Sequence, residues 1–466
     1  MLMCPSNRKG TRLKSKRKLG RFSSELLSGS SRVDVNGWIF LRTRGDAYQL
    51  GFQHGKLLAS EIVSAIGAVR LLGEGGYKRS WQFFCESAME LFWPKLPEEY
   101  KDEISGIVDG VRADGIRNVR LEDIVALNGY FDIVSYHYWL KSKEIEAKPQ
   151  TARAEHCSVF IATGNNTSSG QIVLAHNTWF QYITGAKYNT IIDVSPAKGA
   201  EFVMQAMPGT ISSGTDWCIS KTGMVVSEAT ISGMTTFNQD GLPYFLRSRK
   251  AIQHAKSIDQ WVKTMVTGNN GGYANDWLIG DTNTGEIAWL ELGTFRHKLK
   301  RTRNGAFVGS NLALSDEVRS ETAFNYEDKS GSCTARYERL NQLIKSNEGK
   351  ISVELAKTLL ADHHDSYTNK DTPNRNTICG HIESDQRGLP EWEYGPNYPG
   401  GTFDAKATDT ELAKRGAFWG HWGRPCDTPF MKEQFLVEHP EYEWQRRGLQ
   451  DIRTYPWTLF STWTKL

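Results

Sequence analysis

"AEHCSVFIATGNNTSSGQIVLAHNTW", residues 154–179, contains two short apolar runs joined by a loop of Gly, Asn, Thr and Ser. Runs of this length, rich in β-branched residues and bounded by turn residues, predict a β-hairpin. Cys157 opens the first predicted strand, and His176 lies where the second one is expected to end. The hairpin should therefore bring a thiol and an imidazole to the same end of two neighbouring strands.

The same pattern of short strands continues toward the carboxy terminus. Further strands are predicted in "TIIDVSP", "EFVMQAMPG" and "GAFVGSN", and two hairpins in "DWCISKTGMVVSEAT" and "DWLIGDTNTGEIAWLELG". Helical stretches near residues 243–266, 334–346 and 352–361 lie between or after them. Strand pairs followed by helix pairs predict an antiparallel sheet system covered by helices, which is an α+β fold.

The chain before the hairpin has a different character. Apolar residues at helical spacing predict helices in "RGDAYQLGFQHGKLLASEIVSAIGAVRLL", "LPEEYKDEISGIVDGVRADG" and "LEDIVALNGYFDIVSYHYW". The polar residues 141–156 that follow predict an exposed linker. We therefore expect three parts: a tail over residues 1–35, a helical segment over residues 36–156, and a strand-rich main domain over residues 157–466.

The formal net charge of +3 has its origin at the amino-terminal end of the chain. Eight basic residues precede the first acidic residue, Glu25: Arg8, Lys9, Arg12, Lys14, Lys16, Arg17, Lys18 and Arg21. Such a segment can bind nucleic acid or an anionic membrane, although a disordered, solvated tail is the simpler expectation. No apolar run reaches the roughly 18 residues of a membrane-spanning helix. We expect no nucleic-acid partner and no stable membrane insertion, and the sequence does not predict the oligomeric state.

The seven cysteines are scattered and include no CxxC pair, which argues against a disulfide scaffold or a zinc knuckle. The adjacent His363 and His364 are badly placed to face one ion, so a structural role is expected for them. "FWGHWGRPCD", which contains His421 and Cys426, is expected to form an aromatic packing cluster. No Walker loop, dinucleotide-binding glycine motif or GxSxG elbow is present. The sequence therefore predicts no metal site and no cofactor.

Cys157 is the one cysteine whose position suggests chemistry. If the His156–Cys157 bond were cut, Cys157 would become the first residue of a chain, with its thiol beside its own α-amino group. An α-amino group has a pKa of about 7.7–8.0, so it can act as a base near neutral pH. A nucleophile and its base would then come from one residue. The alternative is a buried structural cysteine, which is the commoner role of this residue type.

Several segments, in the right order, carry a family resemblance. "HCSVFIATG", "IVLAHNTWFQY", "GTISSGTDWCISKTGMVVSEATISG", "GGYANDWLIGDTNTGEIAWLELG", "GSCTARYERLNQL" and "GTFDAKATD" resemble the phospholipase B-like family of N-terminal nucleophile hydrolases. The amino-terminal "GDAYQLGFQHGKLLASEI" is similar to the related isopenicillin N acyltransferase and choloylglycine hydrolase group. The resemblance covers roughly residues 44–430. It implies a four-layer αββα sandwich, with the helical segment attached to the catalytic domain after self-cleavage.

The resemblance also implies roles for individual residues. Cys157 would be the nucleophile, His156–Cys157 the cleaved bond, Asn275 the oxyanion donor, and Thr230, Asn177 and Trp179 would shape the substrate pocket. His176 would assist proton transfer, and Arg336, for which Arg339 is a competing match, would favour the thiolate. The implied reaction is hydrolysis of an acyl ester or linear amide through a thioester, with a small acyl substrate and no metal or organic cofactor.

Alternatives to hydrolysis remain at this stage. Acyl transfer to an amine would use the same residues. An unprocessed lipid-binding protein is a further alternative, because His156 is not the small residue often found before such a nucleophile. Two expectations about the compartment disagree. The chain as written lacks the apolar core of a secretory signal and would be intracellular. The family resemblance instead implies a lysosomal or secreted protein.

Overall fold

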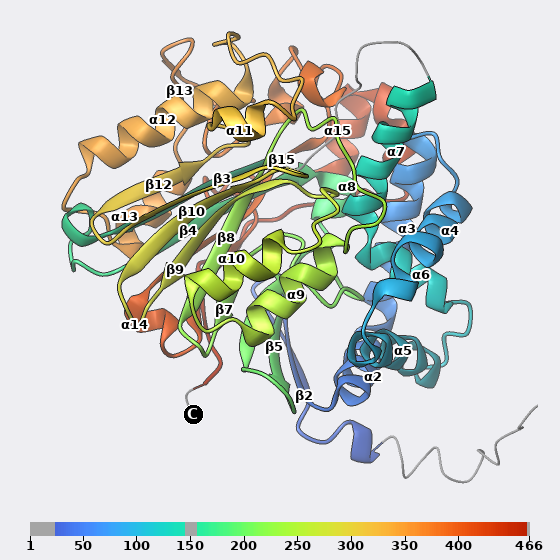
Figure 1. Cartoon of the computed structure of the whole chain (residues 1–466). Helices are drawn as coiled ribbons and strands as arrows, with labels where there is room; N and C mark the ends of the chain where they lie inside the picture. Colours follow the sequence, from blue (N-terminus) through green and yellow to red (C-terminus); the bar gives the residue numbers. More distant parts are fainter. Residues whose placement is uncertain (1–23, 145–155, 464–466) are drawn as a thin grey trace, which may run out of the picture.

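The computed structural model describes residues 24–144 and 156–463, and its strands form two large sheets and one small ribbon (Figure 1). The nine-stranded sheet has the order β1 (Ser31–Val35), β2 (Trp38–Gly45), β5 (Thr190–Pro196), β6 (Phe202–Ala206), β7 (Cys218–Ser220), β8 (Met224–Thr230), β9 (Asn275–Asp281), β10 (Glu286–Leu292), β11 (His297–Thr302). The six-stranded sheet has the order β12 (Gly305–Gly309), β3 (His156–Thr163), β4 (Val173–Gln181), β15 (Gly400–Asp409), β16 (Ala417–Trp422), β17 (Thr458–Ser461). The ribbon pairs β13 (His364–Asp365) with β14 (Lys370–Asp371).

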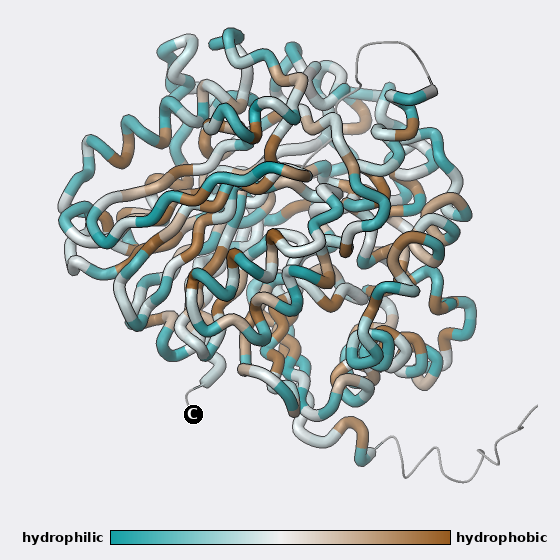
Figure 2. Tube along the Cα trace, viewed as in Figure 1, coloured by the Kyte–Doolittle hydropathy of each residue, from teal (hydrophilic) through white to brown (hydrophobic). Residues whose placement is uncertain are grey.

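The two large sheets pack face to face, with β3 and β12 of one against β8 and β9 of the other. Glycines mark the closest approaches. A Cβ added to Gly309 would lie 2.9 Å from Val159 and 3.1 Å from Ala229 of the opposite sheet. A Cβ added to Gly280 would lie 3.2 Å from Ile161. Brown, hydrophobic stretches follow the strands in Figure 2, whereas teal prevails on the outer helices and loops, so the main core lies between and around the sheets.

Helices cover the outer faces of both sheets (Figure 1). Helices α9 (Tyr244–His254) and α10 (Ile258–Val266) pack on the nine-stranded sheet, and α12 (Ser332–Ser346) and α13 (Val353–Leu360) on the six-stranded sheet. A separate helical block precedes β3: α2 (Ala47–Leu57), α3 (Ala59–Gly75), α4 (Trp81–Leu91), α5 (Glu98–Ala113), α6 (Leu121–Asn128), α7 (Tyr130–Glu144). Shorter helices are α8 (Tyr182–Gly185), α11 (Asp316–Arg319), α14 (Thr410–Ala413), α15 (Lys432–Glu438), and the 3₁₀ turns η1 (Trp93–Lys95), η2 (Gly164–Asn166), η3 (Ile382–Ser384), η4 (Pro390–Trp392), η5 (Pro440–Gln445). Within the described residues, no helix combines the length and apolar character needed to span a bilayer.

The predicted α+β class is confirmed by these sheets and their covering helices. The boundaries of the predicted tail and helical segment need correction, because β1 lies within residues 1–35 and β2 within residues 36–156. Strand β1 is a largely exposed edge strand, so its residues carry no pattern of a buried element. The eight basic residues between Arg8 and Arg21, and residues 145–155 of the predicted linker, lie outside the described residues.

Two predicted helices are each divided in the structure. The helix expected to run from Arg44 onward is broken at Leu58, between α2 and α3. The helix expected to begin at Leu121 is broken at Gly129, between α6 and α7. A Cβ at Gly129 would lie 2.5 Å from the Phe92 ring, so close packing requires glycine at the break. The apolar pattern did not reveal either break, because it continues from the helix before the break into the helix after it.

Helices α2 and α5 cross with their backbones in contact. The cause is two Gly-x-x-x-Gly pairs, Gly51 with Gly55 on α2 and Gly106 with Gly110 on α5. A Cβ at Gly51 would lie 1.8 Å from the Glu103 carbonyl oxygen, and the other three glycines are equally confined by backbone atoms. Backbone atoms cannot move aside as a flexible side chain can. The sequence therefore fixes this crossing through small residues rather than large ones.

Replacing Gly106 with Ala is expected to destabilise the protein. The new Cβ would lie 2.3 Å from the Tyr48 carbonyl oxygen, so the two helices must separate, at a cost of about 1–3 kcal/mol or more. Thermal unfolding measures the loss as a lower Tm. Gly67 is the matched control, because it lies in α3 with nothing within 4 Å of its added Cβ. Gly67→Ala should leave the Tm unchanged or raise it; equal losses from both variants would contradict the close crossing.

Candidate active site

Cys157 lies fully buried near the start of β3, between the neighbouring strands β12 and β4. Its backbone N–H donates to Oδ1 of Asn311 at 3.2 Å, and its carbonyl oxygen accepts from Nη1 of Arg336 at 2.6 Å. The thiol points toward the nine-stranded sheet, where Sγ lies 4.0 Å from Oε1 of Glu228 on β8. The backbone and the thiol of this residue are thus held by three different polar side chains.

Glu228 is the centre of a buried hydrogen-bond network beside this thiol. Tyr273 Oη donates to its Oε1 at 3.2 Å, and Thr230 Oγ1 donates to its Oε2 at 3.3 Å. With its amide nitrogen facing the carboxylate, Asn275 donates to Oε2 at 3.0 Å and to the Ala274 carbonyl at 2.7 Å. The predicted residues Thr230 and Asn275 therefore lie at the site. Both are bonded to a carboxylate that the sequence reading did not include.

His176 is close to the thiol, as the hairpin predicted. Its ring lies within 4.8 Å of both Cys157 Sγ and a carboxylate oxygen of Glu228. Burial, and secondarily the charge of Lys406, lowers the pKa of His176 well below its usual value, so the imidazole is neutral. One thiol, one imidazole and one carboxylate at this spacing can exchange a proton, and they are also a set that a metal ion could bind.

The position of His176 within its strand differs from the prediction. Strand β4 does not end at His176 but continues to Gln181, because β15 pairs along its whole length. Cys157 is consequently paired with Thr178, and His176 with Val159. His176 and Thr178 share the face of β4 that meets the other sheet.

Asn177 and Trp179 lie on the opposite face of β4. Asn177 Nδ2 donates to the carbonyl of Leu360 at 2.7 Å, and Trp179 Nε1 to that of Ile378 at 3.0 Å. The predicted role of these two side chains in shaping the substrate pocket therefore needs correction. Because side chains alternate along a strand, they support β4 from behind and do not line the cavity described below.

A buried lysine and aspartate lie on β15, next to this part of β4. Lys406 Nζ donates to Asp404 Oδ1 and to Thr178 Oγ1, each at 2.6 Å, and also contacts Gln205 of the other sheet. Gln205 Nε2 in turn donates to Asp404 Oδ2 at 2.7 Å. Burial lowers the pKa of Lys406, and the smaller opposing effects of Asp404 and Cys157 only partly offset this shift. A cation held between the sheets would favour the thiolate form of Cys157.

Arg336, on α12, is the predicted arginine that reaches the site. Besides the Cys157 carbonyl, it donates to Asn311 Oδ1 at 2.8 Å, and its guanidinium lies 4.4 Å from the centre of the Trp179 ring. Arg339, the competing match, instead forms a salt bridge with Asp362 at 2.5 Å. Arg336 is buried, and Arg339 is partly exposed. Residues three apart lie on the same side of a helix, so their partners, and not the helical spacing, separate the roles of the two arginines.

Sequence reasoning missed Glu228 and Asn311, two of the residues nearest Cys157. Asn311 follows β12 in the left-handed region, with φ of 75°, and its Nδ2 donates to the Thr230 carbonyl at 2.7 Å. Glu228 lies within the otherwise uncharged strand "MVVSEAT". A lone acid in a buried strand is a signal that could have identified Glu228, because burying an unpartnered carboxylate is costly.

A narrow, mainly apolar cavity lies beside the network. Its lining includes Phe180, Thr230 and Tyr273, and also Phe131 of α7, whose ring stacks on Tyr273 at 4.6 Å. The part of this cavity that a water-sized molecule can enter is about 20 Å³, so the lining side chains nearly fill it. Helix α7 belongs to the segment before Cys157, so both sides of the candidate cleavage point line the cavity.

Comparison with known proteins gives one family match and several distant relatives. A family model described as phospholipase B matches residues 80–289. An uncharacterized protein of Archaeoglobus fulgidus is 24% identical over 357 residues, which are 70% of this chain and 58% of that protein. A phospholipase B of Crotalus adamanteus is 22% identical over 336 residues, 65% of this chain and 59% of that protein. Phospholipase B-like protein F of Dictyostelium discoideum is 29% identical over 121 residues, 24% of this chain and 22% of that protein. Even the two longer matches span less than two thirds of the relatives' own length.

Proposed function

Because the chain belongs to the phospholipase B-like family, we propose that it is a hydrolase that releases acyl chains from lipid esters or from linear amides. Its relatives in Crotalus adamanteus and Drysdalia coronoides are named as phospholipases B, which supports phospholipids as the substrate class. The aromatic lining of the cavity beside Thr230 is apolar, as an acyl chain requires, although the cavity would have to widen to admit one. The observation that carries the proposal is the setting of Cys157, whose N–H, carbonyl and thiol each meet a different polar side chain.

The proposed maturation step cuts the His156–Cys157 bond. Cys157 Sγ attacks the carbonyl carbon of His156, and the amide becomes a thioester as the proton from sulfur passes to the departing nitrogen. Water then hydrolyses the thioester, which leaves a carboxylate on His156 and a free α-amino group on Cys157. Asn311 already accepts a hydrogen bond from this nitrogen, so the new amine would remain anchored beside its own thiol.

In the proposed turnover the same two groups act on the substrate. The α-amine takes the proton from Sγ, and the thiolate attacks the substrate carbonyl to form a thioester. The amine returns the proton to the departing alcohol or amine, and water releases the fatty acid. The buried Lys406 lies on the side of β4 that faces the thiol, where its charge favours the thiolate. Asn275 would donate to the oxyanion after its amide turns from Glu228, a contribution of about 10²–10³ in rate.

The order of layers supports the N-terminal nucleophile class of this proposal. Helices α12 and α13, the six-stranded sheet, the nine-stranded sheet, and helices α9 and α10 follow one another in space. Two sheets stacked face to face bring side chains of one sheet into contact with side chains of the other. Cys157 on β3 and Glu228 on β8 have this relationship.

The proposal is tested on the purified full chain. Intact mass and amino-terminal sequencing should show two fragments, the larger of which begins at Cys157. Fatty acid release should be measured on lysophosphatidylcholine, phosphatidylcholine and an N-acyl amino acid with the same acyl chain, so that the preferred linkage is identified. A single chain of 52.6 kDa that releases no acid from any of the three would disprove the hydrolase proposal.

A further inference from the structure

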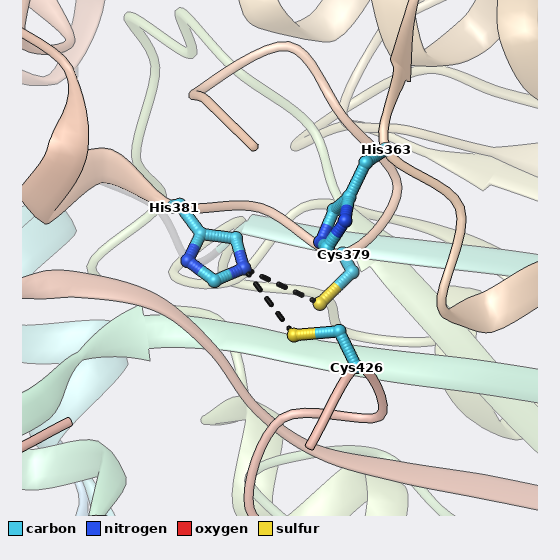
Figure 3. A group of neighbouring side chains, drawn as sticks. All are labelled: His363, Cys379, His381 and Cys426. Atoms are coloured by element: carbon cyan, nitrogen blue, oxygen red, sulfur yellow. Dashed lines mark hydrogen bonds between the residues drawn. The ribbon is translucent and has the colours of Figure 1, made fainter. Parts of the chain in front are cut away.

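Four potential metal ligands lie close together in space, although all come from the last part of the chain, far after Cys157 in sequence: His363, Cys379, His381 and Cys426 (Figure 3). His363 follows α13, Cys379 and His381 precede η3, and Cys426 follows β16. One ligand atom from each residue lies within 4.8 Å of all the others. We call these residues the Cys2His2 cluster and propose that it binds one Zn²⁺ ion.

Two sulfur–nitrogen distances within the cluster match those of a zinc tetrahedron. Nε2 of His381 lies 3.7 Å from Sγ of Cys379 and 3.6 Å from Sγ of Cys426. A tetrahedral ion with bonds of about 2.3 Å to sulfur and about 2.0–2.1 Å to nitrogen separates sulfur from nitrogen by about 3.6 Å. Two thiolates and two imidazoles are a ligand set that selects zinc over magnesium or calcium.

His381 is oriented as a ligand by a hydrogen bond behind it. Its Nδ1 lies 3.0 Å from Oε1 of Glu383, which also forms a salt bridge of 2.9 Å with Arg424. Glu383 further accepts a hydrogen bond from Tyr182 at 3.0 Å, so the carboxylate is fixed and buried. An imidazole that donates from Nδ1 to a carboxylate presents the lone pair of Nε2 toward the sulfurs. This carboxylate–histidine arrangement commonly supports bound zinc.

His363 and the two cysteine sulfurs are also available to bind an ion. His363 Nε2 is buried and has no hydrogen-bond partner among the described residues, and its ring lies 5.1 Å from that of His381. Both cysteines are free. A disulfide would join the two sulfurs but would leave the two converging imidazoles without a function.

The cluster has a structural consequence for the active site. Gly380, between Cys379 and His381, packs so closely against Trp179 that an added Cβ would lie 1.8 Å from the indole ring. Trp179 in turn stacks on Arg336, which holds the carbonyl of Cys157. All four positions around the ion are taken by protein ligands, as in structural rather than catalytic zinc sites. The ion would therefore fix the loop that supports the nucleophile strand from behind.

Metal analysis of the full chain tests the proposal directly. Protein purified under reducing conditions from zinc-supplemented cells should contain one zinc ion per chain, retained on dialysis. Replacement by Co²⁺ should give the visible absorption bands of a tetrahedral site with thiolate ligands. Removing the ion with a strong chelator should lower the Tm. Protein without zinc that also takes up none on titration would overturn the proposal, as would a Cys379–Cys426 disulfide located by peptide mapping in protein purified under those reducing conditions.

Matched variants locate the site. His363→Ala and Cys426→Ser should each weaken zinc binding by about 100-fold or more, because each removes a ligand. Glu383→Gln alters only the hydrogen bond that orients His381, so its loss of affinity should be smaller, about 10–100-fold. His364→Ala and Cys218→Ser are the controls, since His364 bonds Asp371 and Cys218 lies on β7. Both controls should keep one zinc ion per chain. Loss of zinc from the controls but not from the cluster variants would show that the ion binds elsewhere. If a cluster variant fails to fold, the zinc content of the wild-type protein still tests whether the chain binds one ion.

Discussion

A Cys157→Ala variant is expected to remain one chain of 52.6 kDa and to lose fatty acid release by about 10⁴-fold or more. The methyl side chain can neither attack the His156 carbonyl nor form an acyl-enzyme, so both maturation and turnover should stop. Cys157→Ser should be less severe for cleavage, because a hydroxyl can still attack, although it is a weaker nucleophile than a thiolate. Intact mass over several days and a fatty acid assay measure the two steps separately.

The control for this experiment is Cys85→Ala. Cys85 is a buried cysteine of α4 in the helical block, where its Sγ lies 3.7 Å from Asp123. Its replacement should cost some stability but leave the two fragments and the hydrolysis unchanged. If Cys157→Ala matched the wild type in both mass pattern and hydrolysis, Cys157 could not be the nucleophile. If it were cleaved normally but inactive, the cut would be made by another protein.

Replacing Arg336 with Lys should reduce cleavage and hydrolysis by about 10²-fold, although the charge is kept. Arg336 forms hydrogen bonds with the Cys157 carbonyl and Asn311 at once and also stacks on Trp179. A lysine ammonium cannot reproduce this planar, forked geometry. A displacement of the nucleophile by about 1 Å is sufficient for a loss of this size. Rates of fragment formation and of fatty acid release are the measurements, with the Tm recorded alongside.

Arg339→Lys on the same helix provides the comparison. Arg339 pairs with Asp362 in a partly exposed salt bridge, and such pairs contribute about 0–1 kcal/mol. Activity and maturation should therefore remain close to the wild type. Equal losses in both variants would show that the effect comes from α12 as a whole rather than from the contacts of Arg336 with Cys157.

The local parts of the fold could be predicted from the sequence. The strands around residues 157–163, 190–196 and 224–230 were expected where the structure has them, because short apolar runs between turn residues are a strong local signal. Strand β15 was not predicted: "GTFDAKATD" contains Asp404 and Lys406, which read as surface residues. Only the opposing sheet, with Gln205, explains why these charges are buried.

The candidate site was predictable where it is local and hidden where it depends on pairing between distant segments. Cys157 and His176 belong to one hairpin, so their proximity follows from its register. Asn311 reaches Cys157 from 154 positions away, which no spacing rule anticipates. The Cys2His2 cluster was overlooked for the same reason. The adjacent His363 and His364 could not both face one ion, and in the structure only His363 takes part.

The pairing of β2 with β5 gives the proposed cut a consequence for assembly. These two strands run parallel in one sheet, yet β2 lies before Cys157 and β5 after it. Cleavage would therefore turn a single sheet into one shared by two polypeptides, joined by the backbone hydrogen bonds between β2 and β5. Folding of the uncut chain is unimolecular, whereas reassembly of separated fragments would be second order and would depend on their concentrations. The mature protein would be easy to form once and hard to form again, so its lifetime would be set by how slowly it unfolds.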